Sequence, residues 1–274
     1  MNYIVSFNDL ENLKKYKKYT NNFLLGLYKY SVGMNTYYDV NQIINIIKNN
    51  TDCNFYLNLN RLVISDDIYE IKNILLNLKE YNNLYFITTD LGVLNISIDN
   101  DFSNKVIINL ENLTTNYYDF NFYAKFNVLG SFISNEIKYE DLKLITEKKE
   151  YKSFYNGLGY IPMFNSRRSH ISNYLKENYI DDKTYDKYKY YLIEETRNEK
   201  YKILEENNHF IVYRPNMFYF NNQENIDLDY FVFNNIFLSD EKTLYLLDKV
   251  IKGYDLDIEY DDGFLTKEIV YKKG

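Results

Sequence analysis

Residues 54–92, NFYLNLNRLVISDDIYEIKNILLNLKEYNNLYFITTDLG, contain the pattern that decides the fold. Residues 54–64 predict a strand followed by a loop, and residues 84–88 predict a second strand. Between them, residues 67–81 predict a helix that Asp66 or Asp67 is placed to cap. The apolar residues of this helix share one face: Ile68, Ile71, Ile74, Leu75 and Leu78. A strand, a helix and a strand at this spacing indicate parallel strands joined by a crossover helix.

The same alternation continues in both directions along the chain. Further strands are predicted at residues 2–7, 23–28, 105–110, 128–133 and 229–237. Further helices are predicted at residues 40–48, 115–125, 139–147 and 239–251, the last with Ser239 as its N-cap and Gly253 at its end. Seven or eight strands qualify, and none precedes a nucleotide-type glycine-rich turn. The pattern favours the α/β class and a β/α (TIM-like) barrel, which could be incomplete or distorted, with residues 1–274 as one domain.

The last third of the chain departs from this alternation. Residues 156–164 predict one strand, and residues 170–177 predict a helix. Residues 188–212 predict a β-hairpin or small meander that turns at residues 205–208. We therefore expect a small β-rich insertion at about residues 186–214, before the barrel resumes at residue 229. The polar segment 263–267 is expected to lie on the surface.

Composition and charge limit the class of protein. Hydrophobic residues make up 46 % and charged residues 26 % of the chain, as in globular domains, which excludes a disordered protein. The formal net charge of −7 is unusual for a protein that binds nucleic acid by itself. No apolar run reaches the roughly 18 residues of a membrane span, and the first residues lack the charged region of a signal peptide. We expect a cytoplasmic protein that does not contact membranes.

Metal-ligating side chains are scarce, because the chain contains one cysteine, Cys53, and two histidines, His170 and His209. These numbers exclude an internal disulfide, a four-cysteine zinc or iron–sulfur site, and a three-histidine metal site. We therefore expect a reducing compartment, no metal site and no cofactor bound by this chain alone.

The reactive groups of a β/α barrel follow the carboxyl ends of its strands, so polar residues at these places are the candidates for a site. They are Asn58, Asn60, Arg61, Asp90, Asn109, Glu111, Ser134, Asn135, Glu136, Ser166, Arg167, Arg168, Asn234 and Asn235. Asp90 and Glu136 are the candidate catalytic pair, because two carboxylates can act as general acid and base when one has a raised pKa. Each of the two could instead cap the helix that follows it. Asn60 is a candidate for binding substrate.

Arginine is rare in this chain, which makes the adjacent Arg167 and Arg168 its sharpest local feature. Guanidinium groups bind carboxylate or phosphate at two points, so both residues are assigned to substrate binding, with an exposed ion-paired couple as the alternative. Glu195 and Arg197, in the predicted insertion, are further candidates for binding substrate or for an internal ion-pair cluster. His170 could be a base or a structural residue.

Several short motifs occur in order along the chain. They are LNLNR at 57–61, DLG at 90–92, SNEI at 134–137, FYNGLGYIPMFNSRRS at 154–169, EETR at 194–197 with Tyr201, and GFL at 263–265 followed by EIVY at 268–271. Together they resemble the collagenase-like peptidase family U32. The resemblance implies a β/α barrel and one of two activities. One is peptidase or collagenase activity; the other is hydroxylation of RNA or of a quinone ring, in members that hold an iron–sulfur cluster on four cysteines.

This chain differs from the family pattern at the residues that would bind the iron–sulfur cluster. Ser169 stands where the family has a cluster cysteine, and Lys152 stands where it has a glutamate before the F-x-x-G motif. A serine hydroxyl does not replace a thiolate as a cluster ligand. The chain therefore resembles a short, cluster-free form of the members that hydroxylate a tRNA uridine.

Three hypotheses about function follow. The favoured one is a cluster-free subunit of a tRNA uridine hydroxylation complex, with a longer, cysteine-bearing paralogue as partner and with tRNA bound through the complex. The second is a peptidase or other hydrolase that uses Asp90 and Glu136. The third is a non-catalytic barrel that binds a small anion or a partner protein, with aromatic side chains plugging its mouth.

Overall fold

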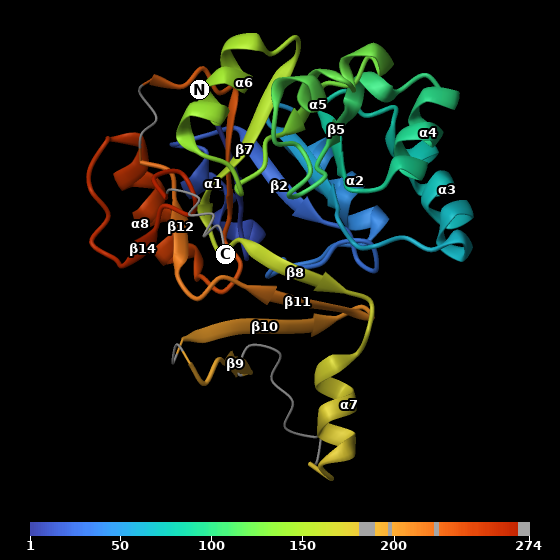
Figure 1. The fold of residues 1–274 in the computed structure, drawn as a ribbon. Coiled ribbons are helices and arrows are strands. Elements are labelled where there is room, and N and C mark those ends of the chain that lie inside the picture. Colours follow the sequence, from blue (N-terminus) through green and yellow to red (C-terminus); the bar gives the residue numbers. More distant parts are fainter. Residues whose placement is uncertain (181–189, 197–198, 222–224, 268–274) are drawn as a thin grey trace.

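Eight parallel strands close into a barrel in this computed structural model, which describes residues 1–180, 190–196, 199–221 and 225–267 (Figure 1). Their order around the barrel is β13-β1-β2-β3-β4-β5-β6-β7, and β13 also pairs with β7, which closes the ring. The bounds are β1 Asn2–Ser6, β2 Asn22–Gly26, β3 Asn54–Leu59, β4 Leu84–Thr88, β5 Val106–Ile108, β6 Gly130–Phe132, β7 Lys152–Gly159 and β13 Tyr230–Asn234. The predicted α/β class and TIM-like barrel are therefore confirmed.

Helices connect the barrel strands from β1 to β7. Their bounds are α1 Leu13–Tyr16, α2 Val40–Asn49, α3 Ile68–Leu78, α4 Leu91–Asp99, α5 Tyr117–Asn121 and α6 Tyr139–Lys148. Two further helices are α7 His170–Glu177, which lies between β8 and β9, and α8 Asp240–Ile251, which follows β13. Ser239 caps α8 as predicted, because its hydroxyl accepts from the Lys242 amide at 3.2 Å. The sequence analysis did not identify α4, whose apolar residues are spread around the helix instead of forming one face. Within the described residues, no helix has the length and apolar character needed to span a membrane.

The barrel strands bury side chains on both faces, as parallel strands covered by helices do. In β1, Ile4 lies in the barrel interior, whereas Val5 packs in the shell between strands and helices. Aromatic rings fill much of the interior, and those of Phe154 and Tyr230 stack with centroids 4.5 Å apart. Tyr230 is the first residue of β13 and lies at the amino ends of the strands, whereas Phe132, the last residue of β6, lies at their carboxyl ends.

A second, antiparallel sheet is inserted between β7 and β13, and Figure 1 shows it beside the barrel with α7 at one end. Its strands, in the order β8-β11-β10-β9, are β8 Pro162–Ser166, β9 Tyr191–Ile193, β10 Lys200–Glu206 and β11 His209–Tyr213. β10 and β11 form a hairpin that turns at Asn207 and Asn208, where φ is 51° and 56°. Asparagine tolerates this left-handed conformation. A β-rich insertion with its turn at this place agrees with the sequence analysis, but the inserted sheet begins at Pro162 of β8 and not at about residue 186.

The inserted sheet is held between the barrel and α7. One face packs against the barrel loops through Val32, Leu204, Ile211, Tyr213 and Ile236. The other face packs against α7 through Ile171, Leu175, Ile203, Phe210 and Val212. In addition, the Glu205 carboxylate accepts from the amides of Ile171 at 2.7 Å and Ser172 at 3.2 Å, which caps the first turn of α7.

The prediction of one strand over residues 156–164 was wrong, because this segment joins two different sheets. β7 ends at Gly159 in the barrel, and β8 begins at Pro162 in the inserted sheet. Gly159 has a φ of +125°, and a Cβ at this position would lie 2.6 Å from the Asn234 carbonyl oxygen. Apolar residues continue on both sides of the break, so periodicity alone does not locate it.

The C-terminal part of the described chain packs against the barrel. β12, Met217–Tyr219, pairs antiparallel with β7, and β14, Tyr260–Asp261, pairs parallel with β12. The expectation that segment 263–267 lies on the surface was wrong for Leu265, which is buried in the shell. The Leu265 carbonyl also accepts from the Tyr139 amide at 3.2 Å. Burial of this one apolar side chain holds the segment in place.

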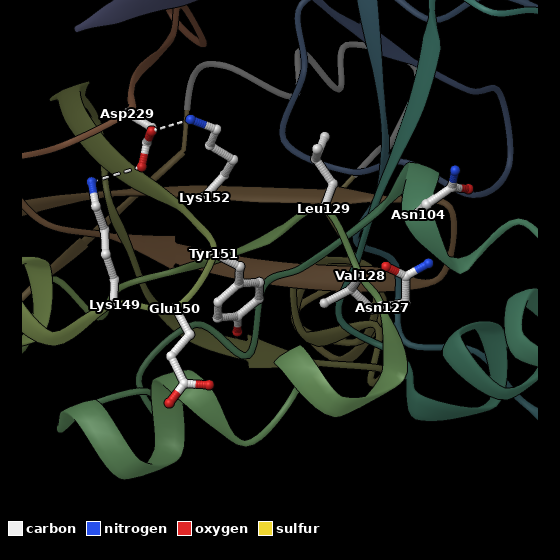
Figure 2. A pocket seen from close by; sticks show the side chains of 9 residues that line it. All are labelled: Asn104, Asn127, Val128, Leu129, Lys149, Glu150, Tyr151, Lys152 and Asp229. Atoms are coloured by element: carbon white, nitrogen blue, oxygen red, sulfur yellow. Dashed lines mark hydrogen bonds and ion pairs between the residues drawn. The ribbon is translucent and has the colours of Figure 1, made fainter.

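A cavity of about 460 Å³ lies at the amino end of the barrel (Figure 2). Within it, Asp229 accepts from the Nζ atoms of Lys149 at 2.8 Å and Lys152 at 2.7 Å, and from the Ser153 amide at 3.0 Å. The Asp229 carboxylate thus forms ion pairs with both lysines that line the cavity. Residues at the amino face of such barrels serve stability, and we assign this ion network to that role.

Acid should weaken the fold through Asp229. Burial alone would raise the pKa of Asp229, but hydrogen bonds from Lys149, Lys152 and Ser153 lower it from 3.8 to about 2. A lowered pKa stabilises the protein fully above pH 3.8, and this contribution is lost as the pH falls toward 2. Asp229→Asn should therefore cost about 2 kcal/mol at pH 7.

Urea unfolding between pH 7 and pH 2 measures this effect. The free energy of unfolding of the Asp229→Asn variant should depend less on pH than that of the parent over the acid range. Asp227→Asn is the matched control, because the Asp227 carboxylate also faces Lys149 but is 80 % exposed. Equal pH dependence of the parent and the Asp229→Asn variant would contradict the assignment.

Candidate functional site

A cavity of about 690 Å³ opens at the carboxyl ends of the barrel strands, where β/α barrels place their active sites. Residues of β8 and of segment 261–267 form parts of its wall. Nine of its described lining residues are asparagines: Asn58, Asn60, Asn109, Asn112, Asn135, Asn156, Asn165, Asn216 and Asn234. Each amide supplies both donors and an acceptor, so the cavity fits a polar ligand with many hydrogen-bonding groups. Among the described residues, five aromatic ones line the cavity without filling it: Phe132, Tyr160, Phe164, Tyr201 and Phe264.

Some of these asparagines hold the fold and others are available to a ligand. Asn60 accepts from the Val32 amide and donates to the Val32 carbonyl, both at 3.0 Å, which clamps a barrel loop. Asn109 uses its side-chain oxygen to accept from the Glu111 amide at 3.1 Å. The side chain of Asn156 makes no hydrogen bond to any residue in the described parts of the chain. The free amide of Asn156 therefore points to ligand binding at β7.

A charged pair lies in the cavity wall. The Arg214 guanidinium donates to the Glu136 carboxylate at 2.6 Å, and its Cζ atom lies 4.9 Å from the centre of the Phe264 ring. Arg214 is buried, whereas the Glu136 side chain is 35 % exposed. The pair orients both groups, and it occupies one oxygen of Glu136.

Glu111 is the second carboxylate of the cavity. It follows β5 with a φ of 55°, a conformation that a residue with a side chain seldom adopts and that is frequent at functional sites. Its two carboxylate oxygens accept from the Asn165 amide at 2.9 and 2.7 Å. Glu111 reaches solvent at the cavity opening, yet burial by the surrounding protein raises the pKa of its carboxyl, and the Asn165 amide opposes that rise. A raised pKa suits this group to act as a general acid or base.

A buried histidine lies behind the cavity wall. The Asn165 side-chain oxygen is 3.3 Å from Nε2 of His209, so Asn165 connects His209 with Glu111. Burial, and then the charges of Arg61 and Arg167, lower the pKa of His209 to about 4. The imidazole is therefore neutral at physiological pH.

Of the residues assigned to catalysis or substrate binding, the structure brings Asn60 and Glu136 into the cavity. Five other candidates that follow strands also line it: Asn58, Asn109, Glu111, Asn135 and Asn234. Asp90 does not line it, because its carboxylate accepts from the Val93 amide at 3.0 Å and caps α4. The cavity therefore does not unite Asp90 with Glu136. A catalytic role for Asp90 stays a prediction, and the observed contact is the capping alternative.

The two adjacent arginines differ in their surroundings. Arg167 is half-buried, two residues beyond Asn165 on the same side of β8, whereas Arg168 is exposed. His170 is also exposed, with Nε2 at 3.3 Å from the Ser166 hydroxyl. Glu195 is exposed in the loop after β9, and Arg197 lies outside the described residues. Arg167 is therefore the one of these residues whose surroundings resemble a binding site.

Sequence reasoning listed Glu111 among the polar residues that follow strands but assigned it no role, and it did not select Arg214 or His209. Arg214 and His209 belong to the inserted part of the chain and meet the barrel only through tertiary contacts. Rarity was a usable signal for both, in a chain with few arginines and two histidines.

A sequence model of Peptidase family U32 matches residues 9–231. The chain belongs to peptidase family U32. A search of curated protein sequences found no match. Among solved structures, this U32 barrel is similar to the U32 peptidase Mk0906, with a TM-score of 0.54 and 11 % sequence identity, over 85 % of this chain and 92 % of that chain. This likeness shows a common fold, and the family expected from the sequence motifs is confirmed.

The residues of this U32 chain do not fit the iron–sulfur cluster that the resemblance implies. Cys53 is buried just before β3, at the amino end of the barrel and opposite the large cavity. Ser169 precedes α7 and offers a hydroxyl in place of a thiolate. In the part of the chain that the structure describes, no three His, Cys, Asp or Glu side chains are grouped to hold a metal. A four-thiolate cluster therefore cannot be held by this chain alone.

Proposed function

We propose that this U32 barrel is the cluster-free subunit of a tRNA uridine hydroxylation complex and binds an RNA base in its asparagine-lined cavity. The lining carries the proposal, because single-stranded RNA bases are recognised by hydrogen bonds to their edges. Asparagine side chains supply a donor and an acceptor together, which suits the edge of a base. The cavity of about 690 Å³ is also in the size range of small-molecule sites.

Two features favour a subunit over a complete enzyme. The chain lacks the thiolates that the family's hydroxylation chemistry requires, so a longer, cysteine-bearing paralogue would supply the cluster. The net charge of −7 is unfavourable for binding the RNA backbone alone, so the partner would also supply basic surface. This chain would contribute base recognition, with Glu111 placed to exchange a proton at the cavity opening.

A tagged pull-down from the native host, with mass spectrometry of the recovered proteins and sequencing of the recovered RNA, tests the proposal. We expect a longer, cysteine-bearing relative in stoichiometric amount, together with tRNA. Recovery of this chain alone, as a clean monomer or homodimer, would overturn the subunit assignment.

Asn156→Leu should separate the cavity from the partner surface. The substitution removes an amide that no described residue uses, and we expect tRNA recovery to fall about tenfold while partner recovery is unchanged. Asn95→Leu is the matched control, because Asn95 is exposed on α4, where its side chain donates to the Asp99 carboxylate at 3.2 Å. Equal tRNA recovery with both variants would count against base binding in the cavity.

A hydrolase is the second candidate, and the raised pKa of Glu111 favours it. In this case Glu111, instead of Asp90, would act as general base on water, with Glu136 fixed by Arg214. Glu111→Gln should lower hydrolysis of denatured collagen or of a peptide mixture about 100-fold, the usual weight of a general base. The absence of any hydrolysis by the parent chain would exclude this candidate.

A further inference from the structure

Three basic side chains meet between the barrel and the inserted sheet, and we call Arg61, Arg167 and His209 the basic recess. β8 and β11 pair antiparallel, and the last aligned pair is Ser166 with Phe210. The next position of this register places Arg167 across from His209. Both lie on the side of the sheet that faces the barrel, as Asn165 does.

Arg61 reaches the same place from the barrel. Its amide donates to the Tyr30 carbonyl at 3.2 Å, and the neighbouring Ser31 carbonyl accepts from Asn207 of the hairpin turn at 3.4 Å. His209 follows that turn directly. The electrostatic effects of Arg61 and Arg167 on His209 agree with this proximity.

The recess contains several buried polar atoms that have no partner. Nε of Arg61, Nε of Arg167 and Nδ1 of His209 are buried and make no hydrogen bond within the described residues. Arg61 and His209 are only 5 % and 1 % exposed. Buried polar atoms are nearly always hydrogen-bonded, so the two unpaired guanidinium donors, Nε of Arg61 and Nε of Arg167, indicate an acceptor that binds there. Nε2 of His209 faces the Asn165 oxygen, so Nδ1 becomes a further donor when the ring is protonated.

The charge of the recess indicates the kind of acceptor. Arg61 is paired with the buried carboxylate of Asp67, and Glu111 is held by Asn165 on the cavity side. Arg167 has no carboxylate partner in the described residues, which leaves one positive charge unbalanced. Arginine forks bind oxyanions at two points, and a phosphate offers several acceptor oxygens to surrounding donors. Water would satisfy single donors and leave this charge unbalanced.

We propose that the basic recess binds a phosphate group of a nucleotide whose base occupies the asparagine-lined cavity. Asn165 joins the two places, because its nitrogen contacts Glu111 in the cavity and its oxygen faces His209 in the recess. The proposal rests on the proposed function only in taking a nucleotide as the ligand. Phosphate binding itself needs neither a partner subunit nor any hydroxylation.

NMR of the histidine imidazoles, combined with calorimetry, tests this site. The chain has two histidines, so the His209 signal is readily assigned with the exposed His170 as internal reference. The probes are inorganic phosphate, uridine, uridine monophosphate and a short oligouridylate. Phosphate-bearing probes should shift the His209 signal and raise its pKa, because a nearby anion favours the imidazolium, and uridine should not. The relative affinities of the monophosphate and the oligouridylate distinguish a free nucleotide from an RNA strand as the source of the phosphate.

Arg167→Gln and Arg168→Gln form a matched pair that removes the same charge one residue apart. We expect Arg167→Gln to weaken binding of uridine monophosphate about tenfold, the effect of one charge-assisted hydrogen bond, and Arg168→Gln to leave it nearly unchanged. Arg167→Lys, which keeps the charge but not the fork, should lie between them. Thermal unfolding of each variant confirms that it is folded.

Two outcomes would overturn the phosphate site. One is an unshifted His209 signal with every phosphate-bearing probe; the other is an equal loss of affinity with both glutamine variants, which would indicate general charge attraction only. Phosphate binding that depends on Arg167, found together with a pull-down that recovers no partner, would support this site and overturn the proposed function. The two failures are therefore distinguishable.

Discussion

Phe154→Ala should lower the free energy of unfolding by about 3–5 kcal/mol. The Phe154 ring is fully buried in the barrel interior, where it lies 4.5 Å from Tyr230 and 5.6 Å from Phe132, between ring centroids. The walls around it are hydrogen-bonded strands of a closed barrel, so they cannot collapse into the space that alanine would leave. The cost should therefore lie toward the upper end of this range.

Urea unfolding followed by circular dichroism measures this cost. Phe122→Ala is the matched control, because Phe122 is 51 % exposed and the change should cost less than about 1 kcal/mol. A loss for Phe154→Ala no larger than that for the control would show that the interior aromatic cluster adds little to the stability of the barrel.

Asp67→Ala should have the second large effect, about 3–5 kcal/mol, because it leaves the buried Arg61 guanidinium without its carboxylate. The two side chains are 6 % and 10 % exposed, so water cannot replace the lost partner. The double variant Arg61→Met with Asp67→Leu removes both charges and should recover most of the stability.

An exposed ion pair provides the control for the Asp67→Ala and double variants. Lys29 and Glu70 also pair, with side chains 44 % and 51 % exposed, and Glu70→Ala should cost less than about 1 kcal/mol. If the double variant were as unstable as Asp67→Ala, loss of packing and not an unpaired charge would explain the result.

Local pattern was sufficient to predict the barrel. The strand at residues 84–88 and the helix at residues 170–177 match β4 and α7 in the structure. Both segments have boundaries set by their own residues, as does α8 with its Ser239 cap. The break at Gly159 was missed, because the decision between barrel and inserted sheet depends on which strand each half pairs with. Such pairing is tertiary information that periodicity does not contain.

The candidate site was predictable only in part, for the same reason. Asn60 and Glu136 were found because a barrel places the residues after its strands around one opening. Arg214, which pairs with Glu136, is 78 positions away along the chain, so no local pattern could join them. Arg167 was selected for its rarity in the sequence, and its neighbour His209 emerged only from the register of β8 with β11.

The position of β13 affects how this chain folds during its synthesis on the ribosome. β13 is the strand that joins β1 to β7, and it pairs Tyr230 with both Asn2 and Phe154. A ribosome delivers it only after the whole insertion, so the growing chain carries two open strand edges during most of its synthesis. Contacts between such distant residues form slowly, and unpaired edges invite association with other chains. Nascent chains that stall before residue 230 should therefore be the form of this protein that most needs chaperones.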